Sequence, residues 1–430
     1  MHYFSTNRTS AHASFREAVL AGQPDDKGLY FPSEIPKLST SFLGELRSLS
    51  NEQIAFDVIR PFVGGEIPDE TLFEICRETV NFSFPLVEIS DRISTLELFH
   101  GPTLAFKDVG ARFMSRCLRY FSRDNQEKTI VVVATSGDTG GAVAAGFHGV
   151  EGIEVLILYP RGKVSKVQEL QLTTLGGNVT TLELQGNFDD CQALAKQALA
   201  DTDLQSKVRL TSANSINVAR WLPQQFYYFY ALKQWSGEPP AISVPSGNFG
   251  NLASGILAHI SGLPIKRFIA ACNANDVVPR FLRTEVYEPH PSVATLSNAM
   301  DVGAPSNFVR ILEIFDNKFV ALKDKLESVS ISDDMTAATM REVYSQCNYI
   351  LDPHGAVGYR ALSDYLEQHP EAKGMFLETA HPVKFDSVNE IIGTQGEVPE
   401  SARDLMSREK QSIVVENDYD QVKEILLSKV

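Results

Sequence analysis

Short apolar runs between residues 129 and 184 predict strands that are buried in the interior. Thr129 to Ala134, Val155 to Tyr159 and Val179 to Leu184 are mostly apolar and rich in β-branched residues. Runs of this length without regular polar alternation are typical of strands buried on both faces. Such strands occur where helices cover both sides of a parallel sheet.

The segments between and after these runs have the spacing and start signals of helices. Asp108 to Phe121 repeats apolar side chains with the period of one helix face. Asn187, with Asp190 three residues later, is a capping signal for the helix after the third run. Two further strands, Val208 to Leu210 and Ile242 to Val244, each lead through a polar turn toward a helix. Strands alternating with helices predict an α/β fold with parallel, doubly wound sheets.

The first part of the chain has a different pattern. Residues 1 to about 90 are mostly helical, with breaks at Gly28–Pro32 and Gly64–Pro68. From Thr379 on, the chain becomes acidic and helical, and we expect this part to pack on the outside. We expect three units: a mostly helical N-terminal domain over 1–92, a smaller α/β lobe over 93–205 and a larger α/β lobe over 206–430.

The charge of the chain bears on its partners. The 430 residues carry a net charge of −15 at pH 7, and no basic run stands out, which argues against nucleic acid or an anionic membrane as the main partner. No run approaches the ~20 apolar residues that span a bilayer, and Met1 to Ser5 lacks the basic and apolar regions of a signal peptide. We expect a cytoplasmic protein that binds a small molecule as a monomer or weak homo-oligomer.

Cysteines and histidines point away from disulfides and metal sites. The five cysteines are widely spaced and contain no CxxC pair, and Cys117, Cys191 and Cys272 lie in apolar patterns. We expect reduced core cysteines. The nine histidines include no close pair, so we expect no metal site.

Lys107 stands out because its position does not favour a charged ammonium. It begins the helical pattern after a Gly-Pro turn and follows Leu104, Ala105 and Phe106. Both the helix dipole and the apolar neighbours should lower the pKa of its ammonium. A lysine with a lowered pKa is nucleophilic and suited to forming a Schiff base. The alternative is a surface lysine whose stem covers an apolar turn.

Three strand-to-helix turns are polar and rich in small residues, namely Thr135–Gly141, Thr211–Asn217 and Pro245–Asn251. Ligands bind at such turns, beyond the carboxyl ends of parallel strands. The last turn suits a phosphate, because small residues let backbone N–H groups approach an anion at a helix N-terminus. The first, which precedes the small-residue helix Ala142 to Phe147, suits a carboxylate. Each could instead be a tight turn that needs glycine.

Known nucleotide and hydrolase motifs are missing from these turns. The sequence has no GxxxxGK[ST], no GxGxxG after a strand and no GxSxG. Arg161 and Lys163 follow the strand Val155 to Tyr159 and suggest an anion clamp. A solvated surface pair is the alternative.

Taken together, the lysine, the two kinds of anion turn and the sheet resemble the fold type II pyridoxal-phosphate enzymes. The resemblance is closer to the threonine synthase family, including its branch with an extra N-terminal domain. Seven segments carry it in the family's order: His100–Asp108, Thr135–Gly140, Ile157–Lys163, Ser212–Asn217, Val244–Gly250, Thr295–Asp301 and Thr379–Phe385.

The resemblance implies a cofactor, a reaction and roles for residues. The cofactor would be pyridoxal 5'-phosphate, bound covalently by Lys107, which would also move protons. O-phospho-L-homoserine and water would become L-threonine and phosphate by γ-elimination and β-addition, the last step of threonine biosynthesis. Thr379 would face the pyridine nitrogen. The cofactor phosphate would lie against Ser246, Gly247, Asn248, Phe249 and Gly250, the substrate carboxylate against Ser136, Gly137 and Thr139, and the substrate phosphate against Arg161, Lys163, Asn214 and Arg220.

Two positions depart from the family's pattern. Asp138 stands where many relatives have an asparagine that contacts the cofactor hydroxyl, and an ionised aspartate cannot donate that hydrogen bond. Glu378 stands where close relatives often have glycine, at the rim near the pyridine nitrogen.

Two other functions remain open at this stage. A serine or threonine dehydratase of the same fold needs no second phosphate site, so Lys163 and Arg220 argue for the synthase. A non-catalytic homologue that binds phosphorylated amines would not need Lys107.

Overall fold

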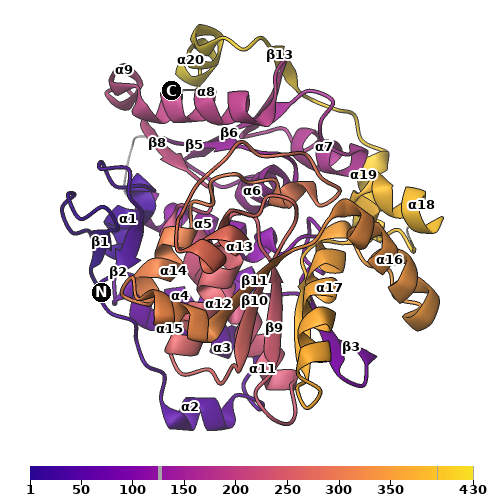
Figure 1. The fold of residues 1–430 in the computed structure, drawn as a ribbon. Helices are drawn as coiled ribbons and strands as arrows, with labels where there is room; N and C mark the ends of the chain where they lie inside the picture. Colours follow the sequence, from indigo (N-terminus) through magenta and orange to yellow (C-terminus); the bar gives the residue numbers. More distant parts are fainter. Residues whose placement is uncertain (124–127, 395, 430) are drawn as a thin grey trace.

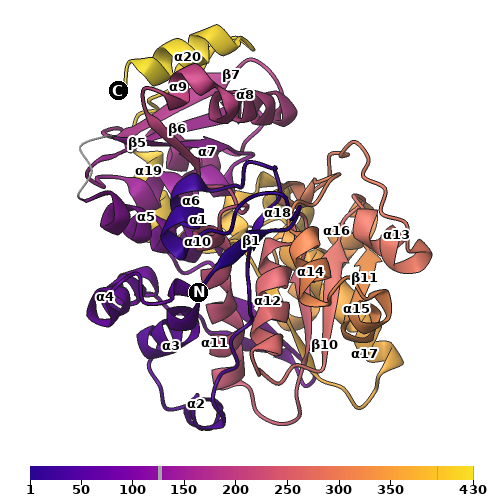
Figure 2. The same ribbon diagram turned by 90° about the vertical axis from the view of Figure 1, so that its left-hand side faces the viewer.

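The computed structural model describes residues 1–123, 128–394 and 396–429. Two sheets, each covered by helices, form two lobes, and the N-terminal segment packs beside both (Figures 1 and 2).

The larger lobe contains a six-stranded sheet in the order β11-β10-β9-β12-β4-β3. Its neighbours are parallel except for β3, which is antiparallel to β4. The strands are β3 (Leu86–Ser90), β4 (Ile93–Glu97), β9 (Ala241–Pro245), β10 (Arg267–Cys272), β11 (Leu326–Ser330) and β12 (Gly374–Glu378). The helical elements of this lobe are α10 (Val218–Trp221), η1 (Leu222–Gln225), α11 (Phe226–Gln234), α12 (Gly250–Ile260), α13 (Val277–Thr284), η2 (Asn298–Met300), α14 (Phe308–Ile314), α15 (Phe319–Lys325), α16 (Asp333–Cys347), α17 (Pro353–Gln368), η3 (Pro382–Lys384) and α18 (Asp386–Ile392).

The smaller lobe contains a parallel, five-stranded sheet in the order β13-β7-β6-β5-β8. Its strands are β5 (Thr129–Ala134), β6 (Ile153–Pro160), β7 (Val179–Leu184), β8 (Arg209–Ser212) and β13 (Ile413–Val415). The helices are α5 (Lys107–Ser122), α6 (Asp138–Phe147), α7 (Lys166–Thr173), α8 (Phe188–Ala200), α9 (Thr202–Gln205), α19 (Glu400–Met406) and α20 (Tyr419–Leu427).

Sheet membership interleaves along the chain. Strand β4 joins the larger sheet, whereas β8 and β13 join the smaller one. The expected division into 1–92, 93–205 and 206–430 therefore places these three strands outside the lobe to whose sheet they belong, and it also assigns β3 of the larger sheet to the N-terminal domain. The physical reason is that hydrogen bonding to a sheet edge, and not proximity in sequence, decides where a strand lies.

Strand positions agree closely with the apolar runs, and one helix begins earlier than expected. The β5 and β7 runs match residue for residue, and Asn187 caps α8 in a capping box with Asp190, as predicted. Helix α6 begins at Asp138, ahead of the expected Ala142. The hydroxyl of Thr135 accepts hydrogen bonds from the N–H groups of Gly137 (3.0 Å) and Gly140 (2.8 Å), which fixes the start of the helix within the polar segment.

The N-terminal region is mainly helical, as expected. It contains a two-stranded antiparallel sheet of β1 (Tyr3–Ser5) and β2 (Tyr30–Pro32). Its helices are α1 (Phe15–Ala21), α2 (Thr40–Glu45), α3 (Asn51–Val63) and α4 (Asp69–Thr79).

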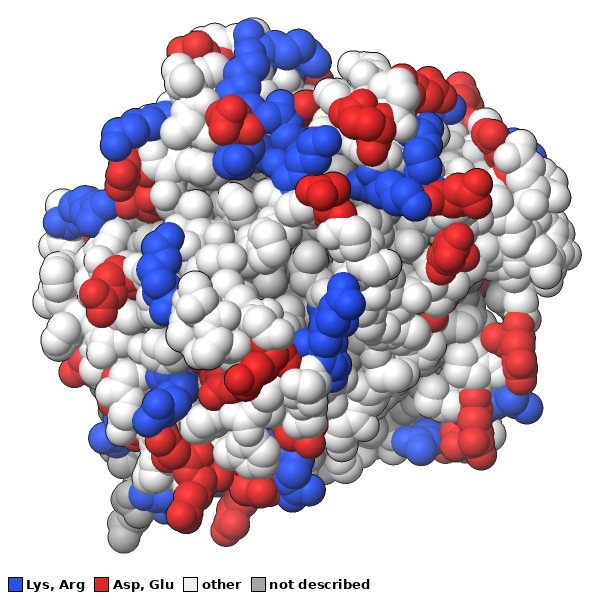
Figure 3. Space-filling model, turned by 90° about the horizontal axis from the view of Figure 1, so that it is seen from below, with Lys and Arg blue, Asp and Glu red and all other residues white. Residues whose placement is uncertain are grey.

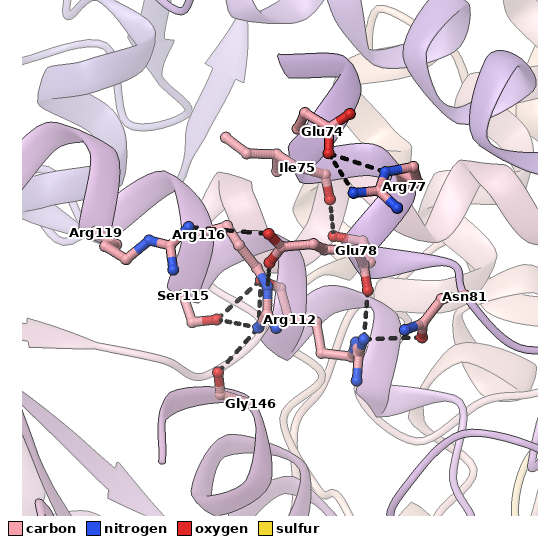
Figure 4. Close-up of polar contacts among 11 residues, drawn as sticks. Glu74, Ile75, Arg77, Glu78, Asn81, Arg112, Ser115, Arg116, Arg119 and Gly146 are labelled. Carbon is pink, nitrogen blue, oxygen red and sulfur yellow. Dashed lines mark hydrogen bonds and ion pairs between the residues drawn. The ribbon is translucent and has the colours of Figure 1, made fainter. Parts of the chain in front are cut away.

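Helix α4 is tied to α5, the helix that starts at Lys107 (Figure 4). Arg116 on α5 contacts the Glu78 carboxylate at 3.0 Å and the Gly146 carbonyl of α6 at 3.1 Å. Arg112 donates to the Asn81 side chain at 2.9 Å and to the Glu78 carbonyl. These contacts attach the N-terminal region to the two helices that begin at predicted site residues.

Among the described residues, no helix has the length and apolar character needed to cross a membrane. On the face seen from below, basic side chains are interspersed with acidic ones (Figure 3).

Candidate active site

A cavity of about 1110 Å³ collects residues from the carboxyl ends of strands of both sheets. Most of the predicted site residues line it, which brings segments far apart in sequence to one place. These are Lys107, Ser136, Asp138, Thr139, Lys163, Asn214, Arg220, Gly247, Asn248, Phe249, Gly250 and Thr379. Gly137 and Ser246 lie in the same turns but not on the cavity wall.

Backbone hydrogen bonds pair the segment that leads to Lys107 with the segment that contains Thr379. The Phe106 N–H donates to the Thr379 carbonyl at 2.9 Å, and the His381 N–H donates to the Leu104 carbonyl at 3.0 Å. Leu104 has φ of 59°, a strained conformation for a bulky side chain. The strained turn lets the chain leave this pairing and enter α5 at Lys107. The pairing thus fixes the position of Lys107 relative to Thr379, the two residues expected to contact different parts of the cofactor.

The environment of Lys107 favours a reactive amine. Burial lowers the pKa of Lys107 to about 8; the Asp138 carboxylate opposes this shift, whereas Lys384 and Arg220 lower the pKa further. The predicted lowering of the pKa is therefore confirmed. Its main cause is burial, with two neighbouring cations that lie far away in sequence.

Asp138 forms a buried ion pair that the sequence analysis did not anticipate. The Lys384 ammonium lies 2.8 Å from Asp138 Oδ1 and also donates to the Thr103 carbonyl at 2.7 Å. Gln168 donates to the same carboxylate oxygen at 2.9 Å. Burial alone raises the pKa of Asp138, but the charges of Lys384 and Lys107 outweigh it and hold the pKa well below its usual range. Asp138 is therefore ionised and can only accept hydrogen bonds.

The turn after β5 presents two hydroxyls to the cavity. Ser136 and Thr139 are half-buried and line the cavity wall. Gly137 between them has φ of 139°, and a Cβ there would come within 2.6 Å of the Gln168 side chain. Only glycine fits at this position. Two hydroxyls at the start of helix α6 suit a carboxylate ligand.

The turn after β9 offers free backbone donors at the start of α12. Across the described parts of the chain, the N–H groups of Gly247, Asn248 and Phe249 donate to no protein acceptor. Phe249 has φ of 63°, so the turn is held in a left-handed conformation at the helix start. Donors in this arrangement, at the positive end of a helix, bind a phosphate group.

The Asn248 side chain ties this turn to two other segments. It donates to Ser215 Oγ at 2.8 Å and accepts from the Ser306 N–H at 2.6 Å. Its role is therefore to hold the turn in shape, in addition to offering its backbone N–H.

Arg220 is a buried cation with an unused donor. It is 3% exposed, and its Nη1 donates to the Ala213 carbonyl at 2.5 Å. Its Nε and the Asn214 Oδ1 are buried without a partner within the described chain. Burial lowers the pKa of Arg220 to about 10, so the guanidinium stays charged at neutral pH. Unsatisfied buried groups beside a cavity indicate a missing polar ligand.

The side chains of Arg161 and Lys163 lie in different places in the structure. Lys163 is exposed and lines the cavity. Arg161 lies 3.4 Å from Glu183, its side chain is 54% exposed, and it is not part of the cavity wall. The expectation that Arg161 contacts the substrate phosphate is therefore not supported by its position. Glu183 at the end of β7 draws the side chain away from the site.

Several cavity residues were missed by the sequence analysis. His354 follows an aspartate at a helix start, and Asn7 and Lys27 come from the N-terminal region. Lys384, which was also missed, does not line the cavity but pairs with Asp138, which does. A lysine within the run Pro382–Phe385 was a usable signal, because an isolated charge among apolar residues usually has a buried partner. Nothing local marks Asn7 or Lys27.

Comparisons with known proteins match this architecture. The family described as "Pyridoxal-phosphate dependent enzyme" matches residues 93–376, "Threonine synthase N terminus" matches 2–80, and "Threonine synthase, C-terminal" matches 355–426. A threonine synthase from Haemophilus influenzae is 43% identical over 431 residues, covering 99% of this chain and 100% of the relative.

Two solved structures have the same overall fold. The threonine synthase from Escherichia coli is 42% identical, with a TM-score of 0.93 and full coverage of both chains. The threonine synthase from Brucella melitensis, a structure with bound pyridoxal phosphate, is 36% identical with a TM-score of 0.92, covering 100% of this chain and 99% of its own.

Proposed function

Since the chain belongs to the threonine synthase family, we propose that its cavity converts O-phospho-L-homoserine and water into L-threonine and phosphate with the residues described above. As a member of this family, the protein is a lyase that depends on pyridoxal phosphate and acts in threonine biosynthesis. The assignment of the site rests on one observation: the groups that the reaction needs line a single cavity. These are the Lys107 amine, the free N–H groups of the turn after β9 and a second cationic group around Arg220.

The residues of the cavity fit the cofactor. Lys107 has a lowered pKa and is the amine suited to covalent attachment. The free N–H groups of Gly247 to Phe249 suit the cofactor phosphate, with Ser246 and Gly250 completing the turn. Thr379, whose carbonyl accepts from the Phe106 N–H and which lines the cavity, has a hydroxyl suited to the ring nitrogen. When bound, the cofactor supplies the electron sink that elimination and addition require.

The remaining residues bind the substrate and move protons. Ser136, Gly137 and Thr139 hold the substrate carboxylate at the start of α6. Arg220, Asn214 and Lys163 hold the substrate phosphate, and their charge stabilises it as it leaves. Lys107, once free as an amine, takes and returns protons at the substrate carbons. Asp138 remains ionised beside Lys107 and Lys384, which keeps the local charges balanced.

A lysine substitution tests this assignment directly. Lys107→Ala should leave a folded protein that lacks the absorbance of the covalently bound cofactor and forms no threonine. Lys323→Ala, which removes an exposed lysine on α15, is the matched control and should behave as wild type. Threonine formation at the wild-type rate by Lys107→Ala would contradict the assignment.

The cellular setting follows from the same features. The net charge of −15 and the small-molecule cavity support a cytoplasmic enzyme without a nucleic-acid or membrane partner. For the oligomeric state, the proposal is a monomer or weak homo-oligomer. Sedimentation velocity over a range of protein concentrations measures this state.

A further inference from the structure

Three buried polar residues form a chain of hydrogen bonds that starts at Glu378, directly before Thr379, and they have no part in the mechanism above. Glu378 and Asp352 are fully buried, and His354 is 3% exposed. Glu378 ends β12 and directly precedes Thr379, whereas Asp352 caps the start of α17, the helix that packs on β12. Because side chains alternate along a strand, Glu378 points away from the face that Thr379 presents to the cavity.

The fold makes room for the Glu378 carboxyl group. A Cβ on Gly355 would lie 1.5 Å from Glu378 Oε2, so only glycine is compatible with this glutamate. Glu378 Oε1 accepts a hydrogen bond from the Asp352 N–H at 2.8 Å, and Oε2 is buried without a partner among the described residues. Burial first, and then the nearby Asp352 carboxylate, raise the pKa of Glu378 well above its usual range.

Neighbouring carboxylates are satisfied by other groups. Glu97, the strand neighbour of Glu378 on β4, accepts from the Tyr349 hydroxyl at 2.8 Å and contacts His100 at 2.7 Å. Asp352 Oδ1 accepts a hydrogen bond from the backbone N–H of His354 at 2.7 Å and also lies 2.5 Å from the ring Nδ1 of His354. For Glu378 the hydrogen bond seen among the described residues comes instead from a backbone N–H, that of Asp352.

Hydrogen bonding specifies the tautomer of His354. Its Nε2 accepts a hydrogen bond from the Ala299 N–H at 3.1 Å, so the ring proton sits on Nδ1 and is donated to Asp352. This links Asp352 on α17 to the short helix η2.

Helix η2 in turn rests on the turn after β9. A Cβ on Gly247 would lie 2.5 Å from Met300 Cα, so backbone packs directly on backbone there. Asp301, just after η2, accepts from Thr295 Oγ1 at 2.7 Å and from Asn273 at 2.9 Å, which anchors the other end of the segment. The segment Thr295–Asp301 is therefore held at both ends over the proposed cofactor-phosphate turn.

We propose that Glu378, Asp352 and His354 form a positioning device that holds η2 against Gly247 and so keeps the phosphate-binding turn in its binding conformation. This inference rests on the proposed function of that turn. Glu378 accepts a hydrogen bond from the Asp352 N–H and so fixes the backbone at the start of α17. Asp352 orients His354, and His354 binds the Ala299 N–H.

Infrared spectroscopy tests the state of Glu378 without any activity measurement. Wild-type protein at neutral pH should show the C=O stretch of a buried, protonated carboxylic acid, and this band should be missing in Glu378→Gln. The glutamine variant keeps the shape and the neutral charge, so its affinity for pyridoxal phosphate should stay within about twofold of wild type. Absence of the band from wild type would contradict the raised pKa of Glu378, and a large loss of affinity in Glu378→Gln would overturn the proposal.

Cofactor binding tests the link to the phosphate turn. We expect His354→Ala to weaken binding of pyridoxal phosphate to the apoprotein about tenfold, the scale of one buried hydrogen bond. Binding of pyridoxal, which has no phosphate, should barely change. His354→Gln should recover most of the affinity, because its amide oxygen can accept from the Ala299 N–H. His369→Ala, at the far end of α17, is the matched control.

The outcomes separate the two proposals. Equal loss of pyridoxal and pyridoxal phosphate binding in His354→Ala, or no loss of either, would refute the positioning device. Failure of His354→Gln to recover affinity would refute the acceptor role. If the wild type binds pyridoxal phosphate but forms no threonine, the proposed function fails while these binding tests still hold.

Discussion

Replacing Lys384 by methionine removes one partner of the buried ion pair beside Lys107. The side chain is fully buried, and its ammonium lies 2.8 Å from Asp138 and 2.7 Å from the Thr103 carbonyl. Methionine preserves much of the volume and the flexible stem. The substitution therefore isolates the charge and its hydrogen bonds.

The magnitude follows from the burial of both partners. Removing one member of a buried pair costs about 3–5 kcal/mol in unfolding free energy, because the remaining charge loses its compensation. Lys107 still lies near Asp138 and attracts it, so we expect about 3 kcal/mol for Lys384→Met. The double variant Asp138→Asn/Lys384→Met should regain about 2 kcal/mol, because it leaves no uncompensated charge.

Urea denaturation of the apoprotein, followed by tryptophan fluorescence and circular dichroism, measures this loss. Coincident transitions from the two signals are needed before free energies are compared. Lys410→Met is the matched control: its ammonium lies 2.7 Å from both Glu169 and Glu183, but the side chain is 35% exposed. For this pair we expect a loss of about 1 kcal/mol or less.

Two results would refute the reasoning. Equal losses for Lys384→Met and Lys410→Met would mean that burial does not decide the energy of these pairs. A double variant as unstable as Lys384→Met would mean that the loss comes from the missing contact with Thr103 or from packing, and not from the uncompensated Asp138 charge.

Three further predictions concern the reaction. Arg220→Ala should lower kcat/KM for phosphohomoserine about ten- to a hundredfold, the effect of one charge-assisted contact of about 1.5–3 kcal/mol. Arg161→Ala should leave kcat/KM unchanged. Equal losses for the two variants in steady-state assays would mean that Arg161 also contacts the substrate phosphate. Thr379→Asp should place a carboxylate at the ring nitrogen, slow γ-elimination and increase transamination; an unchanged cofactor spectrum and product profile would contradict this. The rate at which the apoprotein captures pyridoxal phosphate should rise with pH around a midpoint near 8, because only the neutral Lys107 amine attacks. Asp138→Asn should move this midpoint to lower pH, because the Asp138 charge raises the pKa of Lys107. A midpoint near the ordinary pKa of lysine would contradict the buried environment of Lys107.

Local pattern was sufficient to predict the strands and the turns that follow them. The apolar runs at β5 and β7 specify burial on both faces, and burial on both faces is a property that each segment carries by itself. The start of α5 at Lys107 and the capped start of α8 were likewise predictable, because helix start signals lie within a few residues of the start. Parallel strands then place their carboxyl ends at one edge, so the turns at 135–141 and 245–251 were expected to contribute to a site.

Only the tertiary structure decided which side chains meet. Lys384 pairs with Asp138, His354 with Ala299, and β13 joins the smaller sheet, although each pair is far apart in sequence. Arg161 and Lys163 look alike in sequence, yet the first turns to Glu183 and the second to the cavity. The physical reason is that periodicity along the chain records how deeply each residue is buried, whereas contacts between distant residues depend on strand order and on the path of the chain between sheets.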